Sequence, residues 1–218
     1  MTPETLLQNL MQRYPVLKVC EDQILEAYKM LIRVYESGHI LYVAGNGGSA
    51  ADSDHIVGEL MKSFMAKRTV DENLSTMLCT LYPEEGKGLC HMLEGGLPAI
   101  SLPSLTALST AISNDVAGNM IYAQMINSIG KAGDIFWGIS TSGNSANIVN
   151  AAMVAKAKGL CSLGMTGSRA CKLDEICDVI IHVPETDTYK VQELHLPIYH
   201  ALCAMLESYF FRENDRSI

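Results

Sequence analysis

The stretch HILYVAGNGGS, residues 39–49, decides the fold class. Residues 39–44 form a short apolar run, which is typical of a strand buried on both faces of a sheet. Residues 45–49 are small and polar and predict a loop, after which residues 50–64 have the spacing of a helix. This order of strand, loop and helix favours a parallel sheet covered by helices.

The same order recurs along the rest of the chain. We predict further strands at 99–102, 134–139, 161–165 and 179–183. Helices are expected at 4–11, 16–35, 104–112, 146–158 and 189–211, and one more that follows a turn at 113–115 and ends near 129. Residues 65–98 contain four glycines and show only a short amphipathic piece at 89–93. The chain is therefore predicted to be α/β, with an open parallel sheet and helices on both faces.

Length and composition limit the class of protein. At 218 residues the chain has the size of one ordinary α/β domain, so we expect a single domain over 1–218. With 48% hydrophobic and 18% charged residues it is not intrinsically disordered. Lys and Arg number 16 against 24 Asp and Glu, a net charge of −8 without a basic cluster, which disfavours a nucleic-acid partner.

Cysteine usage and the N-terminal residues indicate the compartment. The chain starts without the basic and then apolar layout of a secretory signal, and apolar runs such as 40–44 are too short to cross a bilayer. The seven cysteines are odd in number and contain no CxxC pair, which suits reduced thiols. We expect a soluble cytoplasmic protein without a membrane partner.

Two predicted junctions between a strand and a helix, at 45–49 and 140–145, are rich in small polar residues. The N-terminus of a helix offers free backbone N–H groups and a positive dipole end, which together favour a bound anion. Ser, Asn and Gly are also ordinary cap residues, but two such loops in one chain favour ligand binding. Neither loop is a Walker A or GxGxxG motif. The sequence therefore predicts a phosphate site rather than a nucleotide site, with the hydroxyls of Ser140, Thr141, Ser142 and Ser145 around it.

Two predicted helices carry residues that suit metal binding or acid–base catalysis. His55 and Glu59 are four residues apart, and Gln192 and His200 are eight apart, so each pair shares one side of its helix. Two nitrogen and two oxygen donors suit zinc, and also iron, manganese or nickel. Without a metal, Glu59 and His200 are the carboxylate and imidazole for general acid–base work. The alternative is that His55 and Glu59 form an ordinary surface pair.

Taken together, five motifs resemble the phosphoheptose isomerase branch of the sugar isomerase (SIS) domain proteins. The resemblance covers about residues 35–66 and 97–212, and the motifs stand in the order of that family. They are GNGGS at 45–49, H-x-x-x-E at 55–59, Asn114-Asp115, STSGNS at 140–145 and Q-E-x-H-x-x-x-x-H at 192–200.

The resemblance implies a single SIS domain with a flavodoxin-like sheet, N-terminal helices over residues 1–37 and an atypical insertion at 65–98. It also implies a cytoplasmic homotetramer that converts sedoheptulose 7-phosphate to D-glycero-D-manno-heptose 7-phosphate through a cis-enediol. Glu59 is then the catalytic base and His200 its acid partner. The remaining roles implied are phosphate binding by Ser140, Thr141, Ser142 and Ser145; sugar binding by Asn46, Ser49 and Asp115; and coordination of zinc, or another divalent metal, by His55, Glu59, Gln192 and His200.

Two departures from the family pattern keep alternatives open. The link at 65–98 is much longer than in the family, and Tyr189 stands where the family tends to have an acidic residue. One alternative is an isomerase of another sugar phosphate. A second is a non-catalytic adaptor of the replication-initiator-associating type, which tends to lack a histidine at the position of His200. A third, a sugar-phosphate-sensing SIS domain, is disfavoured because no helix-turn-helix segment is attached.

Overall fold

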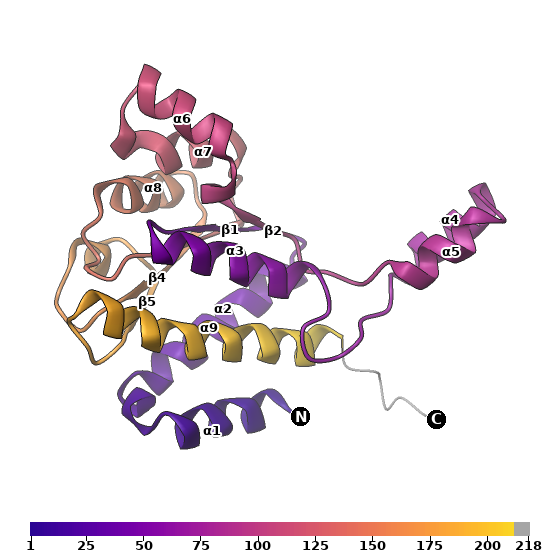
Figure 1. Cartoon of the computed structure of the whole chain (residues 1–218), viewed down its shortest axis with the longest axis horizontal. Coiled ribbons are helices and arrows are strands. Elements are labelled where there is room, and N and C mark those ends of the chain that lie inside the picture. The colour runs from indigo at the N-terminus through magenta and orange to yellow at the C-terminus, as the bar shows by residue number, and fades with distance from the viewer. Residues whose placement is uncertain (212–218) are drawn as a thin grey trace.

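A five-stranded parallel sheet forms the centre of the computed structural model, which describes residues 1–211 (Figure 1). The strands are β1 (Leu41–Ala44), β2 (Ala99–Ser101), β3 (Ile135–Ile139), β4 (Cys161–Thr166) and β5 (Val179–His182). They lie in the order β2-β1-β3-β4-β5, and the direction of the crossovers changes between β1 and β3. This is the flavodoxin-like order implied by the sequence resemblance, and it confirms the predicted fold class.

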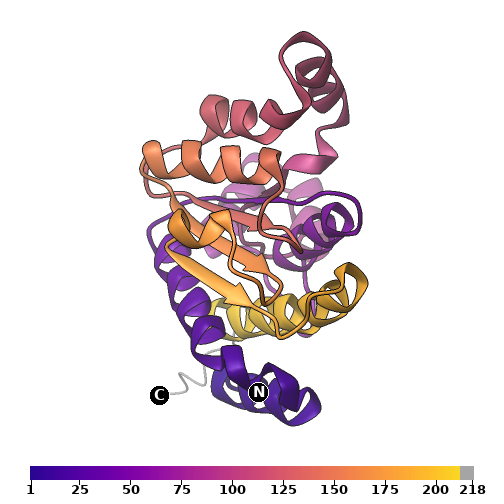
Figure 2. The same ribbon diagram turned by 90° about the vertical axis from the view of Figure 1, so that its left-hand side faces the viewer.

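Helices cover both faces of the sheet, as the continuous burial of β1 and β3 requires. One face packs against α2 (Glu21–Glu36), α3 (Gly48–Met61) and α9 (Thr188–Phe210). The other packs against α6 (Thr106–Asp115), α7 (Ile121–Ile129) and α8 (Ala146–Ala157). Figure 2 shows these two layers on either side of the strands, with α1 (Pro3–Arg13) outside α9.

Alternate residues of β1 point into different hydrophobic clusters. Leu41 and Val43 join the cluster under α2, α3 and α9, whereas Tyr42 and Ala44 join the cluster under α6, α7 and α8. This follows from the two-residue period of a strand. The apolar run at residues 39–44 therefore contributes to the hydrophobic clusters on both faces of the sheet.

The structure corrects two of the predicted elements. Residues Pro15–Cys20 form a 3-10 helix, and α2 begins only at Glu21, because a proline at the start favours a tight turn. Asn114 and Asp115 are the last residues of α6 rather than a turn. The predicted helix at 189–211 is present as α9, and Pro197 lies inside it.

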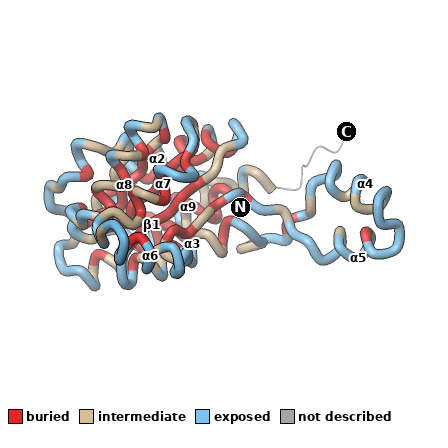
Figure 3. Tube along the Cα trace, turned by 90° about the horizontal axis from the view of Figure 1, so that it is seen from above, coloured by how far each residue is buried: buried red, intermediate tan, exposed pale blue. Residues whose placement is uncertain are grey.

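For residues 65–98 the sequence predicts only a short amphipathic piece, whereas the structure contains two short helices. They are α4 (Glu72–Leu81) and α5 (Glu85–Met92), which pack on each other and project from the rest of the molecule (Figures 1 and 3). No residue of α4 is buried, and Gly86 is the buried residue of α5. Gly86 allows this packing, because a Cβ there would lie 2.3 Å from the carbonyl oxygen of Leu78. We call this pair of helices the α4–α5 hairpin.

Within residues 1–211, none of the helices combines the length and the apolar character needed to cross a membrane. The longest, α9, carries charged and polar side chains along its length, among them Lys190, Glu193 and Glu207.

Removing the α4–α5 hairpin is expected to leave the fold intact. The ends of the hairpin meet, since Gly95 N lies 3.5 Å from Arg68 O, so a short Gly-Ser turn can replace residues 70–94. Because the hairpin buries almost nothing, the melting temperature should shift by no more than roughly 4 °C, which corresponds to about 1 kcal/mol. A thermal melt followed by far-UV circular dichroism measures this shift. Loss of a cooperative transition would show that the hairpin belongs to the core.

Candidate active site

The two polar loops predicted from the sequence lie side by side. They follow the carboxyl ends of β1 and β3, which are adjacent in the sheet at its switch point, the usual ligand site of open α/β sheets. Asn46 and Asn147 join the loops through two reciprocal amide hydrogen bonds of 2.9 and 2.8 Å. The geometry therefore places both candidate phosphate-binding segments at one edge of the sheet.

The loop 140–145 precedes α8 and contains four hydroxyl groups. Ser140 Oγ and Ser145 Oγ are 3.0 Å apart. Ser145 is the N-cap residue of α8, yet its side chain does not cap a backbone N–H, so its hydroxyl stays within the loop. Thr141 and Ser142 line a hollow of about 270 Å³ together with residues 167–170, 185, 186 and 188. Hydroxyl groups beside a helix N-terminus are suited to binding an anion, and we call residues 140–145 the candidate phosphate cradle.

The segment after β4 supports this loop from behind. Gly143 has a φ of +62°, and a Cβ there would lie 2.1 Å from Cys171 Sγ, so only glycine fits. The N–H of Lys172 donates to Asn144 Oδ1 at 3.0 Å. These contacts hold the backbone of the cradle in one shape before any ligand is present.

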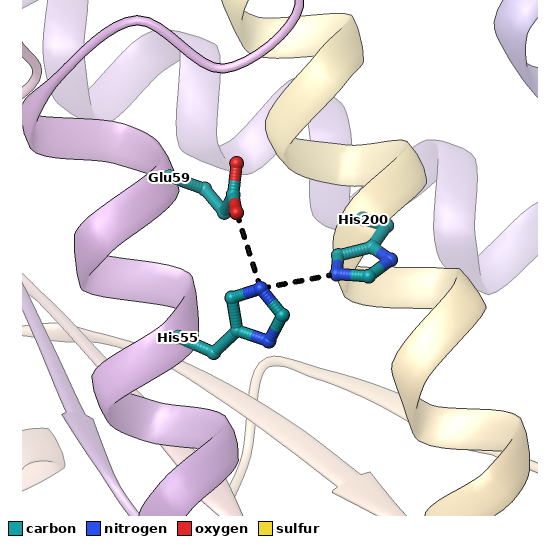
Figure 4. A group of neighbouring side chains, drawn as sticks. All are labelled: His55, Glu59 and His200. Atoms are coloured by element: carbon teal, nitrogen blue, oxygen red, sulfur yellow. Dashed lines mark hydrogen bonds and ion pairs between the residues drawn. The ribbon is translucent and has the colours of Figure 1, made fainter.

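His55, Glu59 and His200 meet between α3 and α9 (Figure 4). His55 Nε2 lies 3.1 Å from Glu59 Oε1 and 3.4 Å from His200 Nε2. One donor atom from each residue falls within 4.8 Å of the others. Glu59 is nearly buried, whereas the His55 side chain is 44% exposed, so the cluster is open to a ligand from one side.

A hydrogen-bonded chain fixes the orientation of His55. The Tyr199 hydroxyl donates to Asp52 Oδ1 at 3.2 Å, so its oxygen accepts from His55 Nδ1 at 3.1 Å. Nε2 of a neutral His55 then carries a lone pair, and it faces Glu59 Oε1, which is also an acceptor. Two acceptors this close repel each other unless a proton or a metal cation lies between them.

Burial shifts the pKa values of His200 and Tyr199. Desolvation and the nearby His55 lower the pKa of His200, so its imidazole is neutral at pH 7. Desolvation, with the neighbouring Asp52, raises the pKa of Tyr199, so its hydroxyl keeps its proton and donates it in the chain to Asp52. A neutral His200 imidazole has one ring nitrogen with a free lone pair, which a metal ion can bind.

The residues present fit a divalent metal such as zinc. Zn–N and Zn–O bonds of about 2.0–2.2 Å in a tetrahedral site put neighbouring donors about 3.3 Å apart. The distances from His55 Nε2 to Glu59 Oε1 and to His200 Nε2, 3.1 and 3.4 Å, are close to this value. Glu59 Oε2 is buried and has no hydrogen-bond partner among residues 1–211, and a cation would satisfy it. The hydrogen bond from Nδ1 to Tyr199 is the outer contact that metal-binding histidines usually make.

The other predicted site residues lie in different places. The Gln192 amide packs on Gly48 at the start of α3, where a Cβ would lie 2.7 Å from its Nε2. Ser49 is buried in the first turn of α3. Asp115 ends α6 on the opposite face of the sheet from α3 and α9, and accepts a hydrogen bond from Asn114. The structure therefore unites three of the four candidate ligands and leaves Asp115 apart from them within one chain.

Sequence reasoning missed four residues that contact this cluster or its helices. They are Asp52 and Tyr199, which orient His55, and Arg68 and Glu207, which form a buried ion pair of 2.7 Å. Asp52 lies one helical turn before His55, and Tyr199 is next to His200. Because Asp52 and Tyr199 are far apart along the chain, no sequence pattern indicates that they meet.

Comparison with known proteins places the chain among sugar isomerases. The SIS domain family model matches residues 75–167. The phosphoheptose isomerase of Aneurinibacillus thermoaerophilus is 36% identical over 86% of this chain and 81% of its own length. Phosphoheptose isomerase 2 of Campylobacter jejuni is 36% identical over 83% and 77%. The chain belongs to the phosphoheptose isomerase family.

Solved structures of phosphoheptose isomerases agree with this assignment. The enzyme from Neisseria gonorrhoeae superposes with a TM-score of 0.71 at 26% identity, over 93% of each chain. The enzyme from Francisella tularensis shares the fold, with a TM-score of 0.70 at 24% identity over 94% of this chain and 95% of its own.

Replacing Tyr199 by Phe is expected to weaken metal binding without unfolding the protein. The variant keeps the ring and its packing but removes the oxygen that accepts from His55 Nδ1. Loss of such an outer partner typically costs about tenfold or more in metal affinity. Titration of zinc against a competing chelator measures the change. Unchanged affinity would show that Tyr199 does not orient His55.

Proposed function

We propose that this member of the phosphoheptose isomerase family interconverts sedoheptulose 7-phosphate and D-glycero-D-manno-heptose 7-phosphate. The observation that carries the proposal is the convergence of His55, Glu59 and His200 between α3 and α9, in a chain that also has a hydroxyl-rich loop at the switch point of the sheet. The family membership supplies the reaction, and these side chains supply the means to perform it.

Isomerisation moves a carbonyl group from C2 to C1 of the sugar. A base must take a proton from C1 and return it to C2, through a cis-enediol, while a second group manages the proton on the oxygens. Glu59 is the base in this proposal, because it is the carboxylate of the cluster, with Oε1 3.1 Å from His55 Nε2. The neutral imidazole of His200 is the acid partner that exchanges the oxygen-bound proton.

A zinc ion or another divalent metal is part of the proposal. His55, Glu59 and His200 would hold it. Gln192, whose amide packs on Gly48 in this structure, would serve as the fourth ligand only after its side chain turns toward the cluster. When bound, such an ion acts as a Lewis acid that stabilises negative charge on the oxygens of the sugar. The chain's own residues still perform the proton transfer and the binding of the phosphate.

The loop 140–145 is proposed to bind the phosphate through the hydroxyls of Ser140, Thr141, Ser142 and Ser145. Asn46, Ser49 and Asp115 are proposed to contact sugar hydroxyls. Binding energy gained at a phosphate remote from C1 and C2 is used to orient those carbons, which is how phosphosugar enzymes raise the rate of a simple proton transfer. The reciprocal bonds of Asn46 with Asn147 link the sugar-binding loop to the phosphate cradle.

We further propose that the protein is a cytoplasmic homotetramer with sites at subunit interfaces. Asp115 lies on the face of the sheet opposite the metal cluster, so a sugar contact by Asp115 requires a site shared with a neighbouring subunit. Light scattering of the purified protein measures the assembly directly.

The test of the function is a turnover assay with sedoheptulose 7-phosphate, before and after chelation and with zinc added back. We expect activity that falls with the chelator and returns with zinc. Activity that the chelator does not change would support the isomerase function but contradict the role of a metal. Absence of turnover with metal supplied would contradict the substrate, and other ketose phosphates would then be assayed.

Replacing Glu59 by Gln is expected to reduce kcat by at least about a hundredfold, since removal of a general base typically costs a factor of 10² to 10⁴. Glu193→Gln is the matched control, because Glu193 is an exposed carboxylate on α9. The control should keep its activity. Substantial turnover by the Glu59 variant would remove this residue from the role of base.

A further inference from the structure

The strongest polar feature outside the catalytic cluster is a buried ion pair. Arg68 Nε donates to Glu207 Oε1 at 2.7 Å, and the two side chains are 0% and 3% exposed. A buried ion pair is weak evidence for stability, because the loss of hydration offsets most of the attraction. Arg68 lies at the base of the α4–α5 hairpin, and Glu207 lies on α9.

Arg68 holds the C-terminal end of α3. Its Nη2 donates to the carbonyl oxygen of Glu59 at 2.8 Å, and its Nη1 donates to that of Leu60 at 2.6 Å. These carbonyls lie in the last turn of α3, where they lack partners inside the helix and where a cation is favoured by the helix dipole. The guanidinium group thus binds the main chain of the residue proposed as the catalytic base.

Glu207 binds the turn that follows α3, at residues 64–66. It follows His200 by seven residues, just under two turns of α9, so the two side chains lie on one side of that helix. Its carboxylate accepts from the N–H groups of Phe64, Met65 and Ala66 at 2.8 to 3.1 Å. The Phe64 ring in turn lies 5.8 Å from the ring of His200.

The catalytic cluster depends on the register of α3 against α9, because α3 provides His55 and Glu59 and α9 provides His200. Apolar contacts between two helices tolerate sliding, whereas a forked set of hydrogen bonds does not. Arg68 and Glu207 together form five hydrogen bonds to the end of α3 and the turn after it.

We propose that Arg68 and Glu207 are positioning residues that set the distance between Glu59 and His200. The proposal rests on the proposed function, since the distance matters for metal binding and for proton transfer. It predicts that weakening this pair impairs the cluster while the phosphate cradle, which lies on the β3–α8 loop, is unaffected.

The test compares Arg68→Lys and Glu207→Gln with a matched control, Asp134→Asn. Asp134 is also buried and accepts from Ile40 N and Lys131 N, but none of its hydrogen-bond partners in the described chain is on α3 or α9. For each protein, the zinc dissociation constant is measured by competition with a chelator, together with the melting temperature and the kcat and KM for sedoheptulose 7-phosphate. The visible spectrum of the Co²⁺-loaded protein reports the geometry of the cluster.

We expect Arg68→Lys and Glu207→Gln to weaken zinc binding roughly tenfold or more, as changes around metal ligands commonly do. kcat should fall, KM should stay within about twofold because the phosphate contacts remain, and the Co²⁺ spectrum should change. Asp134→Asn should lower the melting temperature but keep the zinc affinity and the spectrum of the wild type.

Three results would overturn the proposal. The first is a folded Arg68→Lys or Glu207→Gln variant with the zinc affinity, spectrum and kcat of the wild type; if one of these variants does not fold, the other decides. The second is an equal loss of zinc affinity in Asp134→Asn at the same fall in melting temperature, which would assign the pair a general structural role. The third is a wild-type protein that neither binds zinc nor turns over substrate, which would remove the proposed function as well. If the wild-type protein turns over substrate without zinc, the kinetic constants decide: the proposal requires a lower kcat at nearly unchanged KM in Arg68→Lys and Glu207→Gln.

Discussion

The packing of α3 against α9 on one face of the sheet is the constraint on which the candidate site depends. Each helix carries part of the cluster, and neither could form it alone. Apolar side chains such as Ile56 and Leu202 hold the two helices on the sheet within one hydrophobic cluster. Polar contacts then specify their register: the Tyr199 hydroxyl joins Asp52 to His55, and Arg68 joins the end of α3 to Glu207.

The order of the strands provides the second half of the site. Because β1 and β3 are neighbours, the loops that follow them meet at one edge of the sheet, and the Asn46–Asn147 pair joins them. α9 starts beside the hollow lined by Thr141 and Ser142 and runs on to the cluster at His200. In the proposed function, phosphate binding and proton transfer therefore take place in different parts of one domain, so that binding energy from the phosphate can orient the reacting carbons.

Much of the fold could be predicted, because its signals are local. Buried strands of a parallel sheet are continuous apolar runs, and the helices between them repeat at their own period. The prediction failed where two local signals compete. Pro15 begins a 3-10 helix inside an apparently helical pattern, and Asn114-Asp115 looks like a turn but ends α6. In residues 65–98 the glycines favour breaks rather than helices, so the prediction missed two helices. Gly86 lies inside α5, where it allows the two helices of the α4–α5 hairpin to pack closely.

By itself the sequence determined the class of fold, the two hydroxyl-rich loops and the identity of the histidines and the carboxylate, because residue type and short spacing carry that information. Only the tertiary structure decided which side chains meet. His55 and His200 are 145 positions apart, and Arg68 and Glu207 are 139 apart. No periodicity extends over such separations, so these contacts follow from how two helices pack on one face of a sheet, with buried polar groups satisfied by the partners that this packing brings within reach.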